Sequence, residues 1–242
     1  MNAERGAAGK LYLLPNLLGA VEPAAVLPAR TLAIARRLRH FVVETPKAAR
    51  AFVKSLPSDY ALRDIAFAEL NEHTPPQDVA ALLAPVLAGE DVALVSDAGC
   101  PGVADPGALL VAAAHRAGVV VVPLVGPSAL LLALMASGMN GQKFVFHGYL
   151  PVRAEARAAA LRSLDAAATA SGATQLFIET PYRNEAIVAA VLAVCRPQTL
   201  FCVAADLTLP SEQIVSRTVE RWRKATSLRL AGRPTMFLLG GD

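Results

Sequence analysis

The 242-residue sequence contains few cysteines, few histidines and few aromatic residues, and only 18% of its residues are charged. The three cysteines, Cys100, Cys195 and Cys202, show no C-x-x-C spacing, which argues against a zinc knuckle or a disulfide framework. We therefore expect a reducing, cytoplasmic setting and no metal. The sequence contains neither G-x-G-x-x-G nor G-x-x-x-x-G-K-[ST], so binding of nicotinamide dinucleotides and ATP hydrolysis lose their main support.

Excess charge and targeting signals are also scarce. The formal net charge of +3 is far below the clustered excess expected of a protein that mainly contacts phosphates, so RNA is a possible partner but not a required one. The first ten residues, MNAERGAAGK, lack the apolar core of a signal peptide. We predict a short disordered lead-in over residues 1–9.

One long uncharged stretch, between Arg116 and Lys143, is long enough to span a bilayer. Gly118, Pro123 and the Gly126–Pro127 pair would interrupt a spanning helix, and the composition changes from β-branched to Leu/Ala-rich across the break. The stretch therefore predicts a buried strand, a turn and a buried helix, and no membrane association.

What the sequence has in abundance is apolar residues, at 54%, arranged as short strand-like runs that alternate with helical patterns. This alternation predicts an α/β fold with mainly parallel sheets. The break near residues 123–127 predicts two consecutive α/β domains, 10–124 and 125–242, with a ligand cleft between them. The predicted strands are 11–14, 41–43, 65–68, 92–95, 119–122, 143–148, 174–178, 199–204 and 235–239.

The most specific signal is SDAGCPGVADPG, residues 96–107, which directly follows the apolar run at 92–95. Small residues let the backbone approach a ligand closely, and the exposed N–H groups of such a loop can bind an adenine or a carboxylate. A plain turn seldom needs so many residues of this kind. Because ligands of open α/β sheets bind beyond the carboxyl ends of the strands, we expect a binding site at this loop.

Two motifs in register, SDAGCPGVADPG and VGPSALLLALMASG, resemble the SDAGTPxxxDPG and PGPSA signatures of the tetrapyrrole methylase superfamily, in particular its ribosomal RNA small-subunit methyltransferase I branch. Other segments resemble that branch in the same order along the chain. They are LYLLPNLLG, ELNEHT, FVFHGYLP, FIETPYR and RPTMFLLGG. The resemblance covers residues 11–241 and implies two α/β domains, S-adenosylmethionine as the cofactor in the cleft between them, and a homodimer.

Carried over position by position, the resemblance implies a set of cofactor contacts made by small or backbone-presenting residues. These are Pro15, Asp97, Ala98, Gly99, Cys100, Val103, Ser128, Ala129, Pro234 and Thr235.

Candidate catalytic residues stand at predicted strand ends. A ribose hydroxyl acceptor would benefit from a general base, and Glu44 and Glu179 are placed where one could act. Such carboxylates more commonly cap the next helix or face solvent. Arg183 could hold a phosphate or simply pair with Glu179.

Two segments depart from the family pattern. Glu44-Thr45-Pro46-Lys47 replaces an acidic-Asp-Thr-Arg motif, and Asp206-Leu207-Thr208-Leu209 replaces Glu-Leu-Thr-Lys. The first hypothesis is methylation of RNA, at a ribose 2'-hydroxyl of ribosomal RNA. A tetrapyrrole or another small molecule is the alternative acceptor. A further alternative is a module that binds S-adenosylmethionine without turnover.

Overall fold

The computed structural model describes residues 8–225 and 228–241, which form two compact units that divide after Ser128. Residues 1–7 of the predicted lead-in lie outside the described residues, whereas Gly9 already donates its amide to the Val86 carbonyl at 2.9 Å. In the described part of the chain no helix has both the length and the apolar character to cross a membrane.

The first unit is built on a five-stranded sheet of order β3-β2-β4-β1-β5 in which all four pairings are parallel. The predicted parallel arrangement is therefore confirmed for this sheet, and each strand is found within one residue of its expected position. The strands are β1 (Lys10–Leu13), β2 (His40–Val43), β3 (Ala66–Glu69), β4 (Val92–Val95) and β5 (Val120–Pro123).

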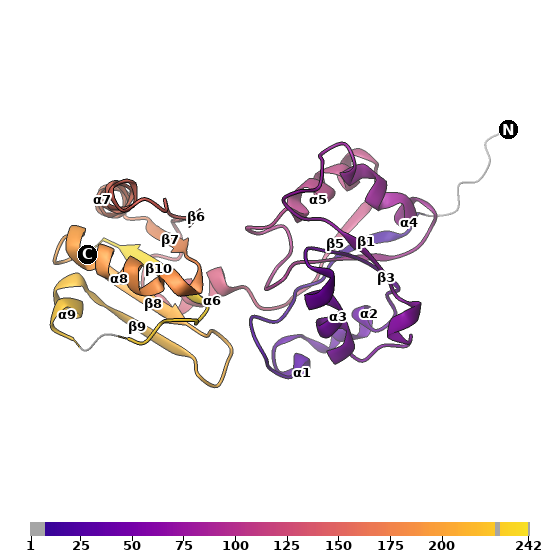
Figure 1. The fold of residues 1–242 in the computed structure, drawn as a ribbon, viewed down its shortest axis with the longest axis horizontal. Helices are drawn as coiled ribbons and strands as arrows, with labels where there is room; N and C mark the ends of the chain where they lie inside the picture. Colours follow the sequence, from indigo (N-terminus) through magenta and orange to yellow (C-terminus); the bar gives the residue numbers. More distant parts are fainter. Residues whose placement is uncertain (1–7, 226–227, 242) are drawn as a thin grey trace. The chain divides into compact units, whose positions relative to one another are not determined.

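Helices cover both faces of this sheet (Figure 1). Because successive strand residues point to opposite faces, Tyr12 and Leu14 pack with α2 and α3, whereas Leu11 packs with α4 and α5. The helices are α1 (Pro23–Val26), α2 (Ala29–Ala35), α3 (Pro46–Ser55), α4 (Ala84–Leu87) and α5 (Gly107–Arg116), with 3-10 turns η1 (Leu62–Asp64) and η2 (Val79–Leu83).

Between β3 and β4 the chain does not form one continuous helix. The structure has the 3-10 turn η2 followed by the single-turn helix α4. Pro85 lies at the start of α4 and has no amide to continue an α-helical hydrogen-bond ladder through this point.

The second unit has a mixed five-stranded sheet of order β6-β7-β10-β8-β9. Only β6 and β7 run parallel, and the other three pairings are antiparallel. The α/β class is confirmed, but the expectation of a mainly parallel sheet is wrong for this unit. Its strands are β6 (Phe144–Tyr149), β7 (Thr174–Ile178), β8 (Leu200–Ala205), β9 (Gln213–Thr218) and β10 (Thr235–Gly240).

A short connection explains why β8 and β9 are antiparallel. Residues 206–212 join β8 directly to β9, with no crossover helix, and parallel neighbours would need a connection of a dozen or more residues. Helices α7, α8 and α9 share one hydrophobic core with the sheet, while α6 packs against β10, β8 and β9. The helices are α6 (Ala129–Ser137), α7 (Ala154–Ser171), α8 (Asn184–Val194) and α9 (Val219–Lys224), with the 3-10 turn η3 (Pro181–Arg183).

Candidate functional site

The candidate site of the first unit lies where the carboxyl ends of β1, β2 and β4 meet at one edge of the parallel sheet. Asn16, which follows β1, joins these strand ends. Its buried side-chain amide donates to the carbonyls of Ser96 (2.9 Å) and Asp97 (3.0 Å), and its backbone amide donates to the Gly99 carbonyl at 2.9 Å. The long loop after β4 is therefore anchored to the end of β1 through the side chain and backbone amide of one residue.

The loop at residues 96–107 is held open by its own backbone geometry. Gly99 has φ +68° and Gly102 has φ +81°, a left-handed region that favours glycine. The Asp105 carboxylate accepts the Gly102 amide at 2.9 Å and the Gly107 amide, which fixes the turn into α5. Burial raises the pKa of Asp105, although the amides of Gly107 and Gly102 counteract part of that rise.

A second loop, at residues 124–128, packs against the first. A Cβ on Gly126 would lie only 2.4 Å from Cβ of Pro15, so glycine permits this close approach. Cys100 replaces the threonine of the family motif, and its Sγ lies 3.5 Å from the Pro127 carbonyl oxygen. Burial raises the pKa of this thiol, so Cys100 acts as a small packing residue rather than as a thiolate.

Carboxylates gather at the same edge of the sheet. The Asp97 side chain accepts hydrogen bonds from Thr45 Oγ1 (2.7 Å) and the Thr45 amide (3.2 Å), and the Asp97 amide donates to Glu44 Oε2 at 3.3 Å. Burial raises the pKa of Glu44; the Asp97 amide lowers it, and the charges of Asp97, Asp105 and Glu72 raise it further. The edge therefore favours a positively charged ligand or a proton.

A pocket of about 650 Å³ opens beside these residues. The segment 16–22, Asp97 and Ala98 line it, together with the face of α3 that carries Ala48, Ala51 and Phe52. Its volume falls within the range of small-molecule sites, and its walls combine apolar surface with a few polar groups, as such sites do.

Two predicted cofactor residues of the second unit, Pro234 and Thr235, lie at the start of β10. Asn184 is fully buried, and its Nδ2 donates to the Arg233 carbonyl (2.7 Å) and to Thr235 Oγ1 (3.1 Å). The Pro234 carbonyl accepts the Asp206 amide at 2.9 Å. Arg233 Nε donates to Asp206 Oδ2 at 2.8 Å, which ties the altered 206–209 segment to the same strand end.

Two backbone and polar features mark this loop of the second unit. Asp206 (φ +53°) and Thr208 (φ +72°) both occupy the left-handed region without being glycine. The Asn184 Oδ1 and Thr208 Oγ1 atoms are buried and have no partner among the described residues. Unpaired buried polar atoms are rare in a plain scaffold and call for a functional explanation.

Glu179 and Arg183 form a buried ion pair at the end of β7. Arg183 Nη2 lies 2.8 Å from Glu179 Oε2, and the two side chains are 17% and 1% exposed. The other carboxylate oxygen of Glu179 accepts the Thr180 amide at 2.8 Å. The Glu179 carboxylate is therefore buried beside Arg183 and the Thr180 amide, while part of the Arg183 side chain faces solvent.

The structure brings most of the predicted cofactor residues together within the first unit: Pro15, Asp97, Ala98, Gly99, Cys100, Val103 and Ser128. Ala129, Pro234 and Thr235 belong to the second unit. Sequence reasoning missed Asn16 and Asn184 as organising residues. The one signal for Asn16 was its position after Pro15, just beyond β1. Across the described ranges, no group of three or more His, Cys, Asp or Glu side chains could hold a metal.

Comparison with known proteins identifies relatives. The profile of the family described as Tetrapyrrole (Corrin/Porphyrin) Methylases matches residues 23–222. Ribosomal RNA small subunit methyltransferase I of Micromonospora olivasterospora is 37% identical over 88% of this chain, which spans 64% of that protein. The protein of that name from Escherichia coli O157:H7 is 30% identical over 96% of this chain and 78% of its own length.

A solved structure supports the fold. Uroporphyrin-III C-methyltransferase from Thermus thermophilus, in complex with S-adenosylhomocysteine, aligns with a TM-score of 0.54 at 19% identity. The alignment covers 96% of this chain and 97% of the other.

Proposed function

The chain belongs to the tetrapyrrole (corrin/porphyrin) methylase family, and we propose that it is an S-adenosylmethionine-dependent methyltransferase whose acceptor is ribosomal RNA. The names of the relatives from Micromonospora and Escherichia coli support this acceptor. Within ribosomal RNA, the proposed target is a ribose 2'-hydroxyl. A cytoplasmic location belongs to the proposal, because that substrate is made and assembled there.

The observation that carries the proposal is the loop at residues 96–107, anchored by Asn16 and bordered by an acidic edge. S-adenosylmethionine supplies an electrophilic methyl group on a positively charged sulfonium. The residues present fit such a donor, since Gly99 leaves room for close approach and the carboxylates of Glu44 and Asp97 favour a cation. The family relative with S-adenosylhomocysteine adds support.

In this proposal the cofactor contacts are distributed over both units. The first unit contributes Pro15, residues 97–100, Val103 and Ser128, while the second contributes Ala129, Pro234 and Thr235. Methyl transfer is an in-line displacement, so the main task of these residues is to hold donor and acceptor in alignment.

Glu44 is the proposed general base. Burial raises its pKa toward the operating range, and a base with a pKa nearer neutrality accepts a hydroxyl proton more effectively in the transition state. Glu179 and Arg183 are the second proposed catalytic element. Their ion pair fixes the guanidinium, whose exposed part could hold a phosphate of the acceptor strand.

A homodimer is also proposed. The edge strand β6 exposes Val145 (44%) and Tyr149 (61%), and Val152 after it is 72% exposed. An apolar edge of this kind is a surface that pairing with a second copy would cover. Sedimentation equilibrium tests the proposal, and a monomer at all accessible concentrations contradicts it.

The test of function is a tritium-methyl transfer assay. Ribosomal RNA from cells lacking the protein and a porphyrin precursor are offered in parallel, and S-adenosylhomocysteine binding is measured by calorimetry. Label in ribosomal RNA at a ribose supports the proposal. Label in the porphyrin alone would replace RNA with a tetrapyrrole acceptor, and cofactor binding without label in either would indicate a non-catalytic binding module. Failure to bind the cofactor at near-millimolar concentration would reject all three.

A further inference from the structure

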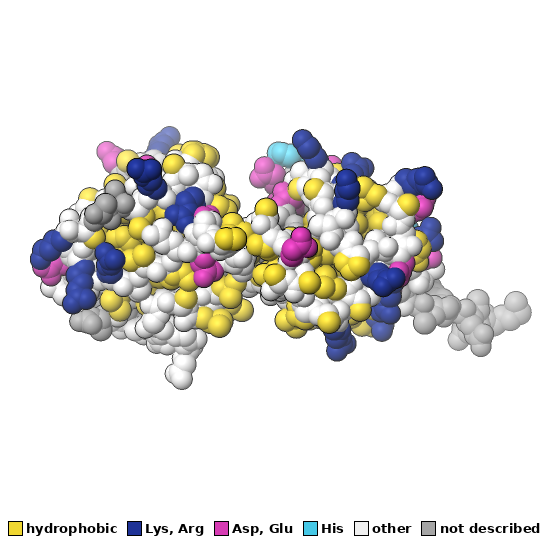
Figure 2. All heavy atoms as spheres, turned by 90° about the horizontal axis from the view of Figure 1, so that it is seen from below, with side chains coloured by type: hydrophobic (Ala, Val, Ile, Leu, Met, Phe, Trp, Pro, Cys, Tyr) yellow, Lys and Arg dark blue, Asp and Glu magenta, His cyan; other side chains and the backbone are white. Residues whose placement is uncertain are grey.

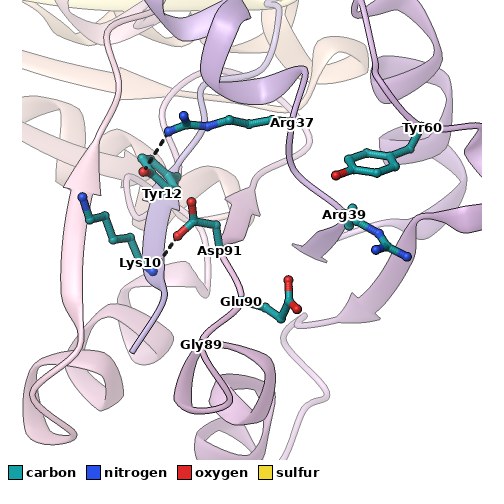
Figure 3. A pocket seen from close by; sticks show the side chains of 8 residues that line it. All are labelled: Lys10, Tyr12, Arg37, Arg39, Tyr60, Gly89, Glu90 and Asp91. Carbon is teal, nitrogen blue, oxygen red and sulfur yellow. Dashed lines mark hydrogen bonds between the residues drawn. The ribbon is translucent and has the colours of Figure 1, made fainter. Parts of the chain in front are cut away.

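A second pocket, of about 390 Å³ (Figure 3), lies at the opposite edge of the first sheet from the candidate site. Its residues stand at or near the amino ends of β1, β2 and β4, where the candidate site uses the carboxyl ends of the same strands. The lining residues are Lys10, Tyr12, Arg37, Arg39, Tyr60, Gly89, Glu90 and Asp91. No step of the proposed reaction uses any of them.

Three cations of this pocket have no acidic partner among the described residues. The Asp91 carboxylate accepts the backbone amide of Lys10 at 2.9 Å, not its ammonium group. Arg37 Nη2 lies 3.4 Å from the Tyr12 hydroxyl, and the Arg39 guanidinium stacks 5.0 Å from the centre of the Tyr60 ring. Their neighbour Arg36, by contrast, is paired with Asp59. The three cations therefore remain available to an anion.

The arrangement of these side chains separates two kinds of contact. Lys10 and Arg37 lie on the Tyr12 side of the pocket, whereas Arg39 lies against Tyr60 on the other side, with the Glu90 carboxylate between them (Figure 3). Lysine and arginine are the residues that bind a phosphate, and an arginine stacked on a tyrosine offers a flat surface for a base. A carboxylate accepts hydrogen bonds from a base amino group or a ribose hydroxyl.

We infer that this pocket binds one nucleotide of an RNA strand, with the phosphate at Lys10 and Arg37 and the base against Tyr60 and Arg39. The inference rests on the proposed RNA substrate and extends it to a second contact outside the methyl-transfer site. The shared chemistry is that of a nucleotide phosphate, which an RNA strand or a free nucleotide could supply.

The charge distribution of the first unit favours an RNA strand. Carboxylates dominate the edge at Glu44 and Asp97, where phosphates would be repelled, whereas in this pocket the three cations outnumber the carboxylates of Glu90 and Asp91. The opposite edge lies only one strand away: β1 has four residues, which corresponds to about 13 Å. On the face shown in Figure 2, Lys and Arg side chains are scattered over each unit, so their distribution on this face does not single out a binding surface.

The experiment measures binding of a short fluorescein-labelled single-stranded RNA, and separately of adenosine 5'-monophosphate, to the full chain. The variants are Arg37→Ala, Tyr60→Ala and Tyr60→Phe. Arg162→Ala is the charge-matched control, because Arg162 is exposed on α7 in the other unit. S-adenosylhomocysteine affinity and thermal unfolding are measured for every variant to detect loss of fold.

Arg37→Ala is expected to weaken RNA binding about tenfold and to lower the slope of log affinity against log salt by about one. Tyr60→Ala is expected to lose about tenfold through lost stacking, whereas Tyr60→Phe retains the ring and the affinity. Arg162→Ala should bind RNA as the unchanged protein does, and cofactor affinity should be the same throughout.

Four results would overturn the inference in different ways. Equal losses in Arg37→Ala and Arg162→Ala would mean that net charge alone is responsible. A loss of adenosine 5'-monophosphate binding with unchanged RNA binding would make a free nucleotide the ligand. If Arg37→Ala and Tyr60→Ala bind and methylate RNA normally, the pocket inference fails while the proposed function stands. If the unchanged protein binds cofactor but no RNA, the proposed substrate fails as well.

Discussion

Asn16 offers the sharpest test of how the loop at residues 96–107 is held in place. Its side-chain amide supplies hydrogen bonds to the Ser96 and Asp97 carbonyls, while its Oδ1 accepts the Leu17 amide at 2.7 Å. Replacing it with Ala removes all three contacts. Replacing it with Asp keeps the acceptor but turns the two donors into a carboxylate that faces two carbonyl oxygens.

The magnitude follows from the number of bonds and their burial. Each net hydrogen bond contributes about 1 kcal/mol, and a buried carbonyl left unpaired costs about 1–3 kcal/mol, so Asn16→Ala should cost the docked loop about 3 kcal/mol. If cofactor binding has to restore the docked loop, that cost reduces affinity by up to about a hundredfold. Asn16→Asp should lose at least as much, because its charge opposes the carbonyl dipoles.

The assay is calorimetric titration with S-adenosylhomocysteine alongside denaturant unfolding. Asn140→Ala serves as the matched control, since Asn140 also bonds backbone groups through its side chain but lies in the second unit. The control should alter stability without changing cofactor affinity. Cofactor affinity within about twofold of the unchanged protein in both Asn16 variants would refute the idea that this residue organises the site.

Three further predictions follow from other contacts. Glu44→Gln should lower the rate of methyl transfer by about a hundredfold or more. The unchanged protein should lose activity as pH falls through the Glu44 pKa, which burial raises, and the rate–pH profile of the variant should lack this acidic limb. Gly126→Ala should cost about 1–3 kcal/mol in denaturant unfolding and weaken cofactor binding, because its Cβ collides with Pro15, whereas Gly141→Ala, with open space around it, should do neither. Asp165→Asn should lose about 2 kcal/mol of stability at neutral pH. Burial alone would raise the Asp165 pKa, but hydrogen bonds from Arg196 and Thr199 lower it overall, so the ionised carboxylate stabilises the fold above the ordinary aspartate pKa and this stabilisation disappears as pH falls through the lowered pKa. Thermal melts of the two proteins should therefore converge at that low pH.

The central strands β2 and β4 of the first unit could be predicted because they are buried on both faces and appear as continuous apolar runs. Val92–Val95 is the clearest case, and β4 has the same bounds. Strand β9 was missed, because Gln213–Thr218 has half-exposed polar residues and no alternation. The place of β10 between β7 and β8 also could not be predicted, since pairing between distant segments leaves no local pattern.

The candidate site divides in the same way. Small residues and glycines predicted the loop at residues 96–107, because backbone positions in the left-handed region favour glycine and so can be recognised from composition. The role of Asn16 could not be predicted, since the carbonyls it contacts lie about 80 residues away in the chain. The ion pair of Glu179 and Arg183 was one of two expected readings of those residues, and only the structure shows how deeply it is buried.

These contacts suggest why the loop at residues 96–107 stays close to the family pattern while residues 44–47 and 206–209 depart from it. The donor loop is shaped by backbone conformation, by Asp105 and by Asn16, so an exchange of threonine for Cys100 leaves its geometry intact. Side chains have to recognise the acceptor, and here Thr45 is hydrogen-bonded to Asp97 and Asp206 is hydrogen-bonded to Arg233. Under the proposed function, changes at residues 44–47 and 206–209 would therefore alter which acceptor is methylated, while the loop at residues 96–107 would still hold the donor.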